Sequence, residues 1–170
     1  MKNILYIFAF AVLCLACQAD KTAYVDTEEL LTEYEELKQA RDKFTKENDD
    51  IIGDLELKIQ SYQIKADLFQ KNGPNMSPRK QQEKANELQA EGQQIQQERQ
   101  ARLGKLQVES QRVIDSIITK VRDKVKSYGK ANGYTYIYGS NDAGSVLYGK
   151  EENDLTQTIL GELNASFKGN

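Results

Sequence analysis

The chain has 170 residues, of which 29% are charged, and its formal net charge is −3. This length suits one domain. A chain with so many charged residues buries too little apolar surface for a large monomeric core, and we therefore expect it to self-associate. An acidic balance without a basic stripe carrying interleaved aromatic residues argues against nucleic-acid binding. The absence of His and Trp, of metal-ligand clusters and of phosphate-binding motifs argues against an enzyme, a cofactor or a metal site.

Residues 1–16 have the pattern of a signal peptide. Lys2 supplies the positive start, and Ile4–Ala16 is an uninterrupted apolar run of 13 residues. A run of this length is short for a membrane span and typical of a secretory signal. The chain is therefore expected to be exported.

The end of this segment has two interpretations that remain open. Cys14-Leu-Ala-Cys17 is similar to a bacterial lipoprotein box, which would make Cys17 the site of lipid attachment. The alternative is ordinary cleavage after Ala19. In the first interpretation residues 17–21 form a linker, and no cysteine beyond Cys17 remains for an internal disulfide.

Residues 27–128 predict a long helical hairpin, the arm of the molecule. A β-prone run, Thr22–Val25, leads into Asp26-x-x-Glu29, which has the spacing of a capping box at a helix start. Apolar residues then recur every three, four or seven positions, as in helices with one narrow apolar seam. In the first limb these are Leu30, Tyr34, Leu37, Phe44, Ile51, Leu55, Ile59, Tyr62, Ala66 and Phe69; in the second, Ala85, Leu88, Ile95, Leu103, Leu106, Val113, Ile117, Val121, Val125 and Tyr128.

Each limb is about 70 Å long at about 1.5 Å per residue. The seam is thin toward the tip, where glutamine is frequent, and Gly92 and Gly104 each cost about 1 kcal/mol relative to alanine. We therefore expect a weakly braced arm.

The tip is expected at residues 72–78. Asn72-Gly73 favours a turn, and neither Pro74 nor Pro78 suits a helix interior. Ser77 before Pro78 is a favourable start for the second helix. An antiparallel pair of helices is therefore expected rather than one continuous helix.

Basic residues gather around this tip in an otherwise acidic chain. They could meet acidic lipid head groups or acidic proteins, or form a plain solvated surface. Tyr62, Phe69 and Met76 offer adaptable apolar contacts or pack in the seam. The residues predicted to contact unfolded proteins or a membrane are Lys65, Phe69, Lys71, Met76, Arg79, Lys80 and Lys84.

Residues 22–26 and 129–170 are predicted to form a small β body with a C-terminal helix. Tyr134–Tyr138 alternates with period two, and a turn-rich stretch separates it from a second β-prone run, Ser145–Tyr148. An antiparallel β-hairpin is expected from these two runs. Asp154-x-x-Gln157 then opens a final helix, and the apolar stripe of this helix is Leu155, Ile159, Leu163 and Phe167. The predicted fold class is mainly α, with a long helical hairpin projecting from a short antiparallel sheet that oligomerises.

So small a sheet needs partners, because its edges and tyrosine-rich faces would otherwise stay open. Pairing with copies of the same chain covers both. The predicted oligomer interface comprises Tyr134, Tyr136, Ile137, Tyr138, Val146 and Tyr148.

The order of these segments resembles the Skp/OmpH family of periplasmic chaperones for outer-membrane proteins. The resemblance covers nearly the whole exported chain, and its most specific part runs from Ala131 to Ile159. It implies a homotrimer whose helical hairpins surround a cavity. It also implies a periplasmic holdase that binds unfolded outer-membrane β-barrel proteins without ATP and prevents their aggregation.

The alternative is an envelope coiled-coil tether or adaptor without chaperone activity, which would share the helical hairpin. In both cases, lipid on Cys17 and the basic arm tip would add association with a membrane.

Overall fold

The computed structural model describes residues 20–141 and 144–168, so the signal-peptide prediction and Cys17 lie outside the described residues. The elements in chain order are β1 (Thr22–Asp26), α2 (Thr27–Glu33), α3 (Glu35–Asn72), the 3-10 turn η2 (Gly73–Asn75), α4 (Pro78–Ala131), β2 (Tyr136–Ser140), the 3-10 turn η3 (Glu151–Asn153) and α5 (Thr156–Lys168). They form two compact units. The hairpin unit is Glu36–Ile118, and the body comprises the flanking segments. The predicted mainly α class with a small β component is confirmed.

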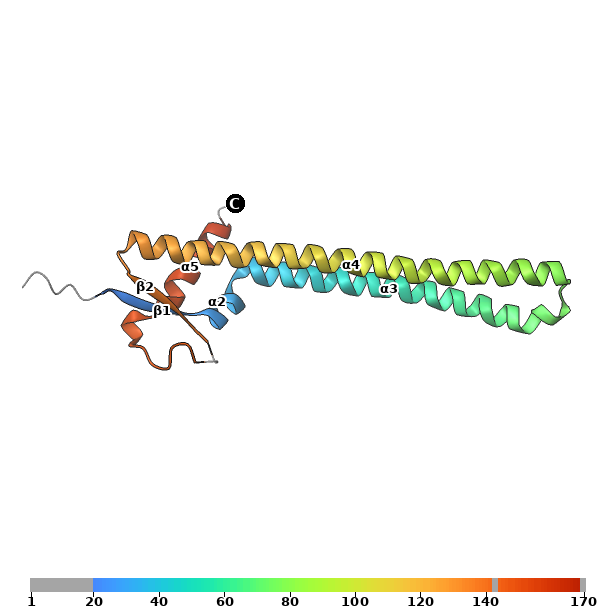
Figure 1. Ribbon diagram of the computed structural model, residues 1–170, viewed down its shortest axis with the longest axis horizontal. Coiled ribbons are helices and arrows are strands. Elements are labelled where there is room, and N and C mark those ends of the chain that lie inside the picture. The colour runs from blue at the N-terminus through green and yellow to red at the C-terminus, as the bar shows by residue number, and fades with distance from the viewer. Residues whose placement is uncertain (1–19, 142–143, 169–170) are drawn as a thin grey trace, which may run out of the picture. The chain divides into compact units, whose positions relative to one another are not determined.

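In the hairpin unit, α3 and α4 run antiparallel to each other (Figure 1). Ion pairs join the two helices, among them Asp54–Arg102 at 3.0 Å, Lys58–Glu98 at 2.5 Å and Lys65–Glu91 at 2.6 Å. The residue numbers rise along α3 as they fall along α4, as an antiparallel pair requires. Within this unit the predicted seam residues are buried or half-buried, and the fully buried ones are Leu37, Phe44, Leu55, Ile95 and Ile117.

The turn between the helices matches the local sequence. Helix α3 ends at Asn72, and the Met76 N–H donates to the Gly73 carbonyl at 2.9 Å. Pro78 is the first residue of α4, where its missing N–H leaves no helical bond unmade.

The first helix is interrupted at Tyr34, so the expected continuous helix from Thr27 is wrong at this point. Tyr34 has ψ 116°, an extended conformation, between α2 and α3. The break is supported from α5, because the Asn164 side chain accepts the Glu35 N–H at 3.0 Å. Lys168 also pairs with the Glu35 carboxylate at 3.1 Å. In a continuous helix the Glu35 N–H would donate to a carbonyl of the preceding turn. After the break at Tyr34, the last turns of α5 supply its partner instead.

The sheet is parallel, and the predicted antiparallel hairpin is wrong. Strand β1 pairs with β2 in the register Ala23↔Ile137. The chain leaves α4 beside the start of β1, where Lys21 Nζ donates to the Asn132 carbonyl at 2.9 Å and the Thr135 N–H donates to the Lys21 carbonyl at 2.8 Å. Strand β2 therefore runs in the same direction as β1.

The second predicted strand, Ser145–Tyr148, forms no strand. The other edge of β1 is occupied by the chain that leads into α5. There the Leu155 N–H donates to the Tyr24 carbonyl at 2.9 Å, and Asp154 forms an isolated bridge with Tyr24. This contact leaves Ser145–Tyr148 without a place beside β1.

The body core is built where β1, α2 and α5 meet. The expected cap of α2 is present, since Asp26 accepts the Glu28 and Glu29 N–H groups at 2.9 Å. In a complete capping box, the Asp26 N–H would also donate to the Glu29 side chain. Here the Asp26 N–H donates to the buried Thr156 hydroxyl of α5 at 2.8 Å. The buried apolar residues here are Ala23, Val25, Leu30, Leu155, Ile159, Leu160 and Leu163.

Tyr24 fixes the segment after β2 against the sheet. Burial, and then the nearby Asp154 carboxylate to which its hydroxyl is hydrogen-bonded, raise the pKa of Tyr24 above its usual value. A Cβ at Gly149 would lie 2.3 Å from the Tyr24 ring, so this close approach requires glycine.

Candidate binding surface

Helix α3 carries an apolar stripe that does not belong to the seam. Leu57, Ile64 and Leu68 are spaced by seven and four residues, which places them within a narrow sector of one helix face. Their exposed fractions are 67%, 61% and 53%. Large aliphatic side chains aligned on a helix face and left in water are typical of a surface that binds another apolar surface.

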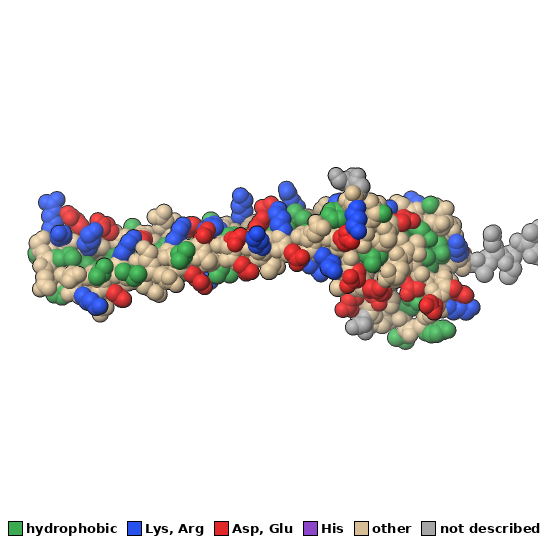
Figure 2. Space-filling model, turned by 180° about the vertical axis from the view of Figure 1, so that it is seen from behind, with side chains coloured by type: hydrophobic (Ala, Val, Ile, Leu, Met, Phe, Trp, Pro, Cys, Tyr) green, Lys and Arg blue, Asp and Glu red, His purple; other side chains and the backbone are tan. Residues whose placement is uncertain are grey.

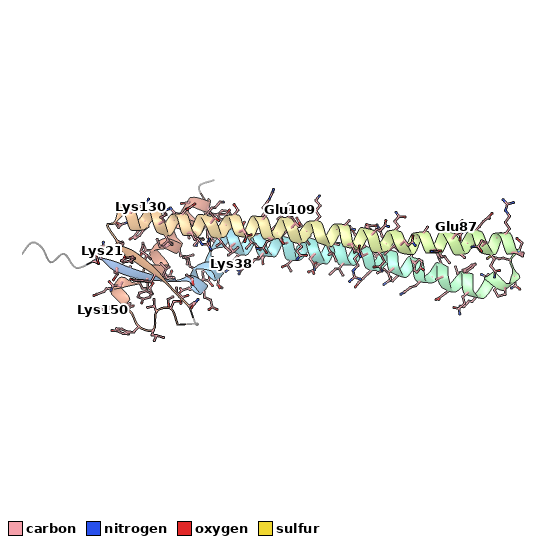
Figure 3. All side chains as sticks on the ribbon, in the orientation of Figure 1. Lys21, Lys38, Glu87, Glu109, Lys130 and Lys150 are labelled. Carbon is pink, nitrogen blue, oxygen red and sulfur yellow. The ribbon has the colours of Figure 1, made fainter. Side chains whose placement is uncertain are left out.

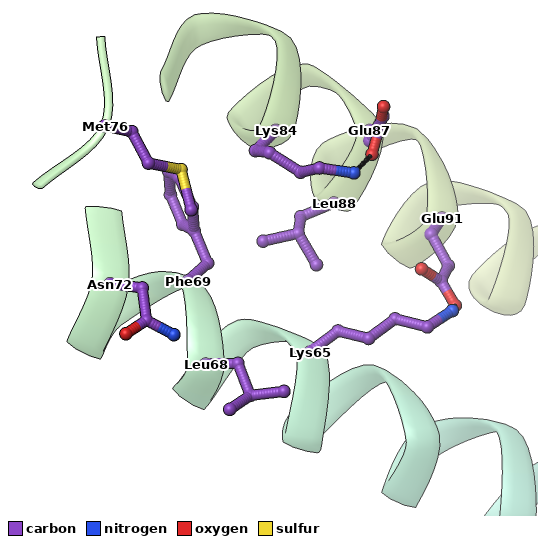
Figure 4. Close-up of a pocket in the computed structure, with 9 residues that line it drawn as sticks. All are labelled: Lys65, Leu68, Phe69, Asn72, Met76, Lys84, Glu87, Leu88 and Glu91. Atoms are coloured by element: carbon purple, nitrogen blue, oxygen red, sulfur yellow. Dashed lines mark hydrogen bonds and ion pairs between the residues drawn. The ribbon is translucent and has the colours of Figure 1, made fainter. Parts of the chain in front are cut away.

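At the arm tip this stripe meets a pocket of about 460 Å³ between α3, the turn and α4. Figure 4 shows Phe69 and Met76 side by side at one end of the pocket and Leu88 reaching in from α4. Leu68 belongs to both the stripe and the pocket lining. We call the two together the arm surface. The complete pocket lining is Lys65, Leu68, Phe69, Asn72, Met76, Lys84, Glu87, Leu88 and Glu91.

The basic residues near the tip are largely compensated. Lys65 pairs with Glu91 at 2.6 Å, Arg79 with Glu83 at 3.0 Å, and Lys84 with Glu87. Figure 2 accordingly shows acidic and basic side chains interspersed along the hairpin. The rim of the pocket is therefore polar but close to neutral. The attraction for an apolar ligand comes from the apolar side chains of the lining, which are Leu68, Phe69, Met76 and Leu88.

The predicted contact residues divide into two groups. Lys65, Phe69, Met76 and Lys84 line the pocket, whereas the basic residues Lys71, Arg79 and Lys80 are exposed outside it. Their role in contacting a partner stays a prediction.

Sequence reasoning missed Leu57, Ile64 and Leu68. The available signal was a second apolar spacing of seven and four residues alongside the seam. Tyr62 belongs to the seam, since a Cβ on Gly92 of α4 would lie 3.3 Å from its hydroxyl.

A network of four charged side chains braces the middle of the hairpin. Glu98 accepts from Lys58 of α3 and, at 3.3 Å, from Arg102, which also donates to Asp54 at 3.0 Å. The hydrogen bond from Lys58, followed by the charges of Lys58 and Arg102, lowers the pKa of Glu98 below its ordinary value of 4.5.

The stability of the hairpin is therefore expected to fall in acid. A carboxyl group whose pKa is lower in the folded than in the unfolded state stabilises the fold at any pH above its unfolded-state pKa. This contribution is lost as the pH falls through its folded-state pKa. Urea unfolding of the wild type should show a lower midpoint at about pH 3 than at about pH 7. Glu98→Gln should lower the midpoint at neutral pH and make this difference smaller. An unchanged difference would show that Glu98 has no part in it.

The predicted interface residues lie along and beside β2. Tyr136 and Tyr138 stack with ring centroids 5.9 Å apart, while Tyr134 stacks on Tyr128 at 6.2 Å. The Thr135 N–H faces β1, so in the parallel pattern the backbone groups of Tyr136 and Tyr138 face the opposite, open edge. Val146 and Tyr148 lie in the segment after β2. An interface role for these residues stays a prediction.

Two further findings concern the part of the chain that the structure describes. There, no three His, Cys, Asp or Glu side chains are grouped so as to hold a metal ion. None of the described helices combines the length and apolar character that crossing a membrane requires.

These features define a class of protein in which an antiparallel helical hairpin connects two strands of a small parallel sheet. The chain belongs to the OmpH-like family, whose model is described as outer membrane protein (OmpH-like) and matches residues 21–163.

The fold is also similar to a crystal structure from Caulobacter crescentus, described as a candidate outer membrane chaperone (OmpH-like). The TM-score is 0.76 over 87% of this chain and 86% of that chain, at 11% sequence identity. At this identity the similarity concerns the fold. No curated protein matches this chain.

Proposed function

We propose that the protein is an ATP-independent holdase chaperone that binds unfolded outer-membrane β-barrel proteins in the cell envelope and prevents their aggregation. The observation that carries the proposal is the arm surface, an aliphatic stripe leading into an apolar pocket on an otherwise polar helical hairpin. Membership of the OmpH-like family and the description of the Caulobacter protein support the same function.

The chemistry of the arm surface suits transient holding. Leucine and isoleucine gain free energy from burial against any apolar segment, and methionine adapts its shape to varied partners. Each contact is small, so a client bound by several of them can be released without an energy source. A protein that binds only the unfolded state keeps that state from aggregating and needs no catalytic group.

Self-association is proposed to complete the body. Among the described residues, no strand pairs with the outer edge of β2, and Tyr136 and Tyr138 are 56% and 50% exposed beside it. Exposed strand edges and aromatic faces favour pairing with another copy. We take the assembly to be a homotrimer, as the family resemblance implies.

The test of holding activity is a mixing experiment. A urea-unfolded outer-membrane barrel protein is diluted into buffer with and without a molar excess of the purified protein, and turbidity is followed. The proposal expects strong suppression of aggregation without ATP. Aggregation at an unchanged rate would contradict it and would favour the envelope tether or adaptor.

Substitution of Ile137 tests the oligomeric state. Ile137 is half-buried, and Ile137→Asp would place a charge in a surface that the proposal covers with a second copy. Light scattering should show the trimer mass for the wild type and the mass of one chain for Ile137→Asp. Ile137→Val, which keeps an apolar side chain, should remain trimeric. A wild type that is monomeric at all concentrations would refute the trimer.

The location is proposed to be the periplasm, with attachment to a membrane if Cys17 is acylated. Mass spectrometry of the protein from isolated membranes should then find diacylglycerol on an N-terminal Cys17. A mature chain that begins at Asp20 would exclude the anchor. Lys71 and Lys80, both exposed at the arm tip, would strengthen contact with acidic lipids.

A further inference from the structure

The body contains an apolar pocket with a cationic rim. Its volume is about 440 Å³, and its floor includes Val121, Val125 and Ile137. Arg122, Lys126 and Lys130, spaced by four residues along α4, line the same pocket. We call this pocket the socket.

The rim of the socket lacks compensation within the chain. Among the described residues, Arg122, Lys126 and Lys130 form no ion pair, in contrast to the paired cations of the arm tip. Like charges four residues apart on a helix repel each other. An acidic ligand with an apolar end would relieve this repulsion and fill the floor.

The same body displays an apolar pair with acidic neighbours. Leu147 and Tyr148, which we call the knob, are 92% and 84% exposed, the highest values among the large exposed hydrophobic residues. Glu151 and Glu152 follow three residues later in the sequence. Glu152 pairs with Lys150 at 3.2 Å, whereas Glu151 forms no ion pair among the described residues.

The knob does not reach the socket of its own chain. Figure 3 shows Lys130, on the socket rim, and Lys150, beside the knob, on opposite sides of the two strands. The pocket linings agree. Val25 and Ile137 line the socket, whereas their neighbours Tyr24 and Tyr138 line the pocket shared with Leu147 and Tyr148, and successive strand residues face opposite sides.

We propose that the knob of one copy inserts into the socket of a second copy, with Glu151 and Glu152 meeting the rim formed by Arg122, Lys126 and Lys130. Both surfaces combine an apolar centre with charge, and the charges are of opposite sign. Because the knob and the socket are different surfaces, the contact is head-to-tail, and such contacts form closed rings when the rotation between copies permits it. This inference rests on the self-association proposed above and assigns the residues that direct it.

Charge reversal tests the contact in the protein as purified from cells. The socket variant is Arg122→Glu/Lys126→Glu, the knob variant is Glu151→Lys/Glu152→Lys, and a third variant carries all four changes. Sedimentation velocity over a range of concentrations measures the dissociation constant of the oligomer. Each double variant should raise this constant about tenfold or more, and the fourfold variant should return to within about threefold of the wild type.

Two further variants separate the contact from general effects. Lys105→Glu/Arg112→Glu changes the net charge as the socket variant does, on exposed residues of the hairpin unit, and should leave association unchanged. Tyr148→Gln removes an exposed apolar side chain and should weaken association about tenfold without loss of helicity.

Double variants that associate like the wild type, or a fourfold variant as weak as the doubles, would overturn the inference. A trimeric mass in all variants would overturn the contact between knob and socket and leave the proposed trimer in place. A monomeric wild type would overturn both. Suppression of client aggregation is measured separately and does not depend on these outcomes.

Discussion

Replacing Leu57, Ile64 and Leu68 together by glutamine is expected to abolish most of the affinity for unfolded clients without destabilising the hairpin. All three side chains are more than half-exposed, so the folded chain loses little packing, and glutamine is a good helix former. Binding a client would bury the remaining apolar area of each side chain, for about 1 kcal/mol apiece. Together the three changes should raise the dissociation constant about a hundredfold.

The measurement is fluorescence titration of a labelled, urea-unfolded barrel protein diluted into the variant. The matched control is Val108→Gln, which removes an exposed apolar side chain from α4 away from the arm surface. This control should change the dissociation constant less than about twofold. Equal losses in the two proteins would mean that binding depends on general hydrophobicity and not on this surface.

Thr156→Val is expected to lower the free energy of unfolding by about 2 kcal/mol, although the two side chains have nearly the same shape. The buried Thr156 hydroxyl accepts the Asp26 N–H at 2.8 Å and donates to the Asp154 carboxylate. It therefore joins the end of β1, the start of α2 and the start of α5. Valine leaves the Asp26 N–H without an acceptor in a partly buried site.

Thermal unfolding at equal chain concentrations measures this loss, which should appear as a midpoint lowered by about 5 °C. Thr156→Ser keeps the hydroxyl and loses one methyl group, so it should cost only about 1 kcal/mol. A valine variant as stable as the wild type would show that the hydroxyl contributes nothing.

The sequence predicted the helical hairpin because the determinants of a hairpin are local. Spacing of three, four and seven residues fixed the seam, and two prolines with a glycine fixed the turn at Gly73–Asn75. Capping by Asp26 was likewise readable from neighbouring residues.

The errors concern contacts between distant segments. The break at Tyr34 depends on Asn164, and the place beside β1 is taken by Asp154 and Leu155 instead of Ser145–Tyr148. Short β-prone runs show where strands form but not which strands pair. The parallel direction follows from the point where α4 returns to Lys21.

The candidate site was predicted only in part. The residue types of Phe69 and Met76 predict adaptable apolar contacts, and both side chains line the pocket. The spacing of Leu57, Ile64 and Leu68 does not distinguish them from seam residues, because only the position of the partner helix shows which face of α3 is covered. The cluster of five basic residues predicted a positively charged tip, whereas three of these residues have carboxylate partners.

Photo-cross-linking from position 64 tests most directly the claim that the arm surface holds unfolded chains. A benzophenone side chain is placed at Ile64 or, as a control, at the exposed residue Lys105, and each protein is irradiated with an unfolded barrel protein. The account predicts efficient cross-links from position 64, few from position 105, and loss of the first when the client is folded beforehand. Equal cross-linking from the two positions, or none from position 64, would contradict it.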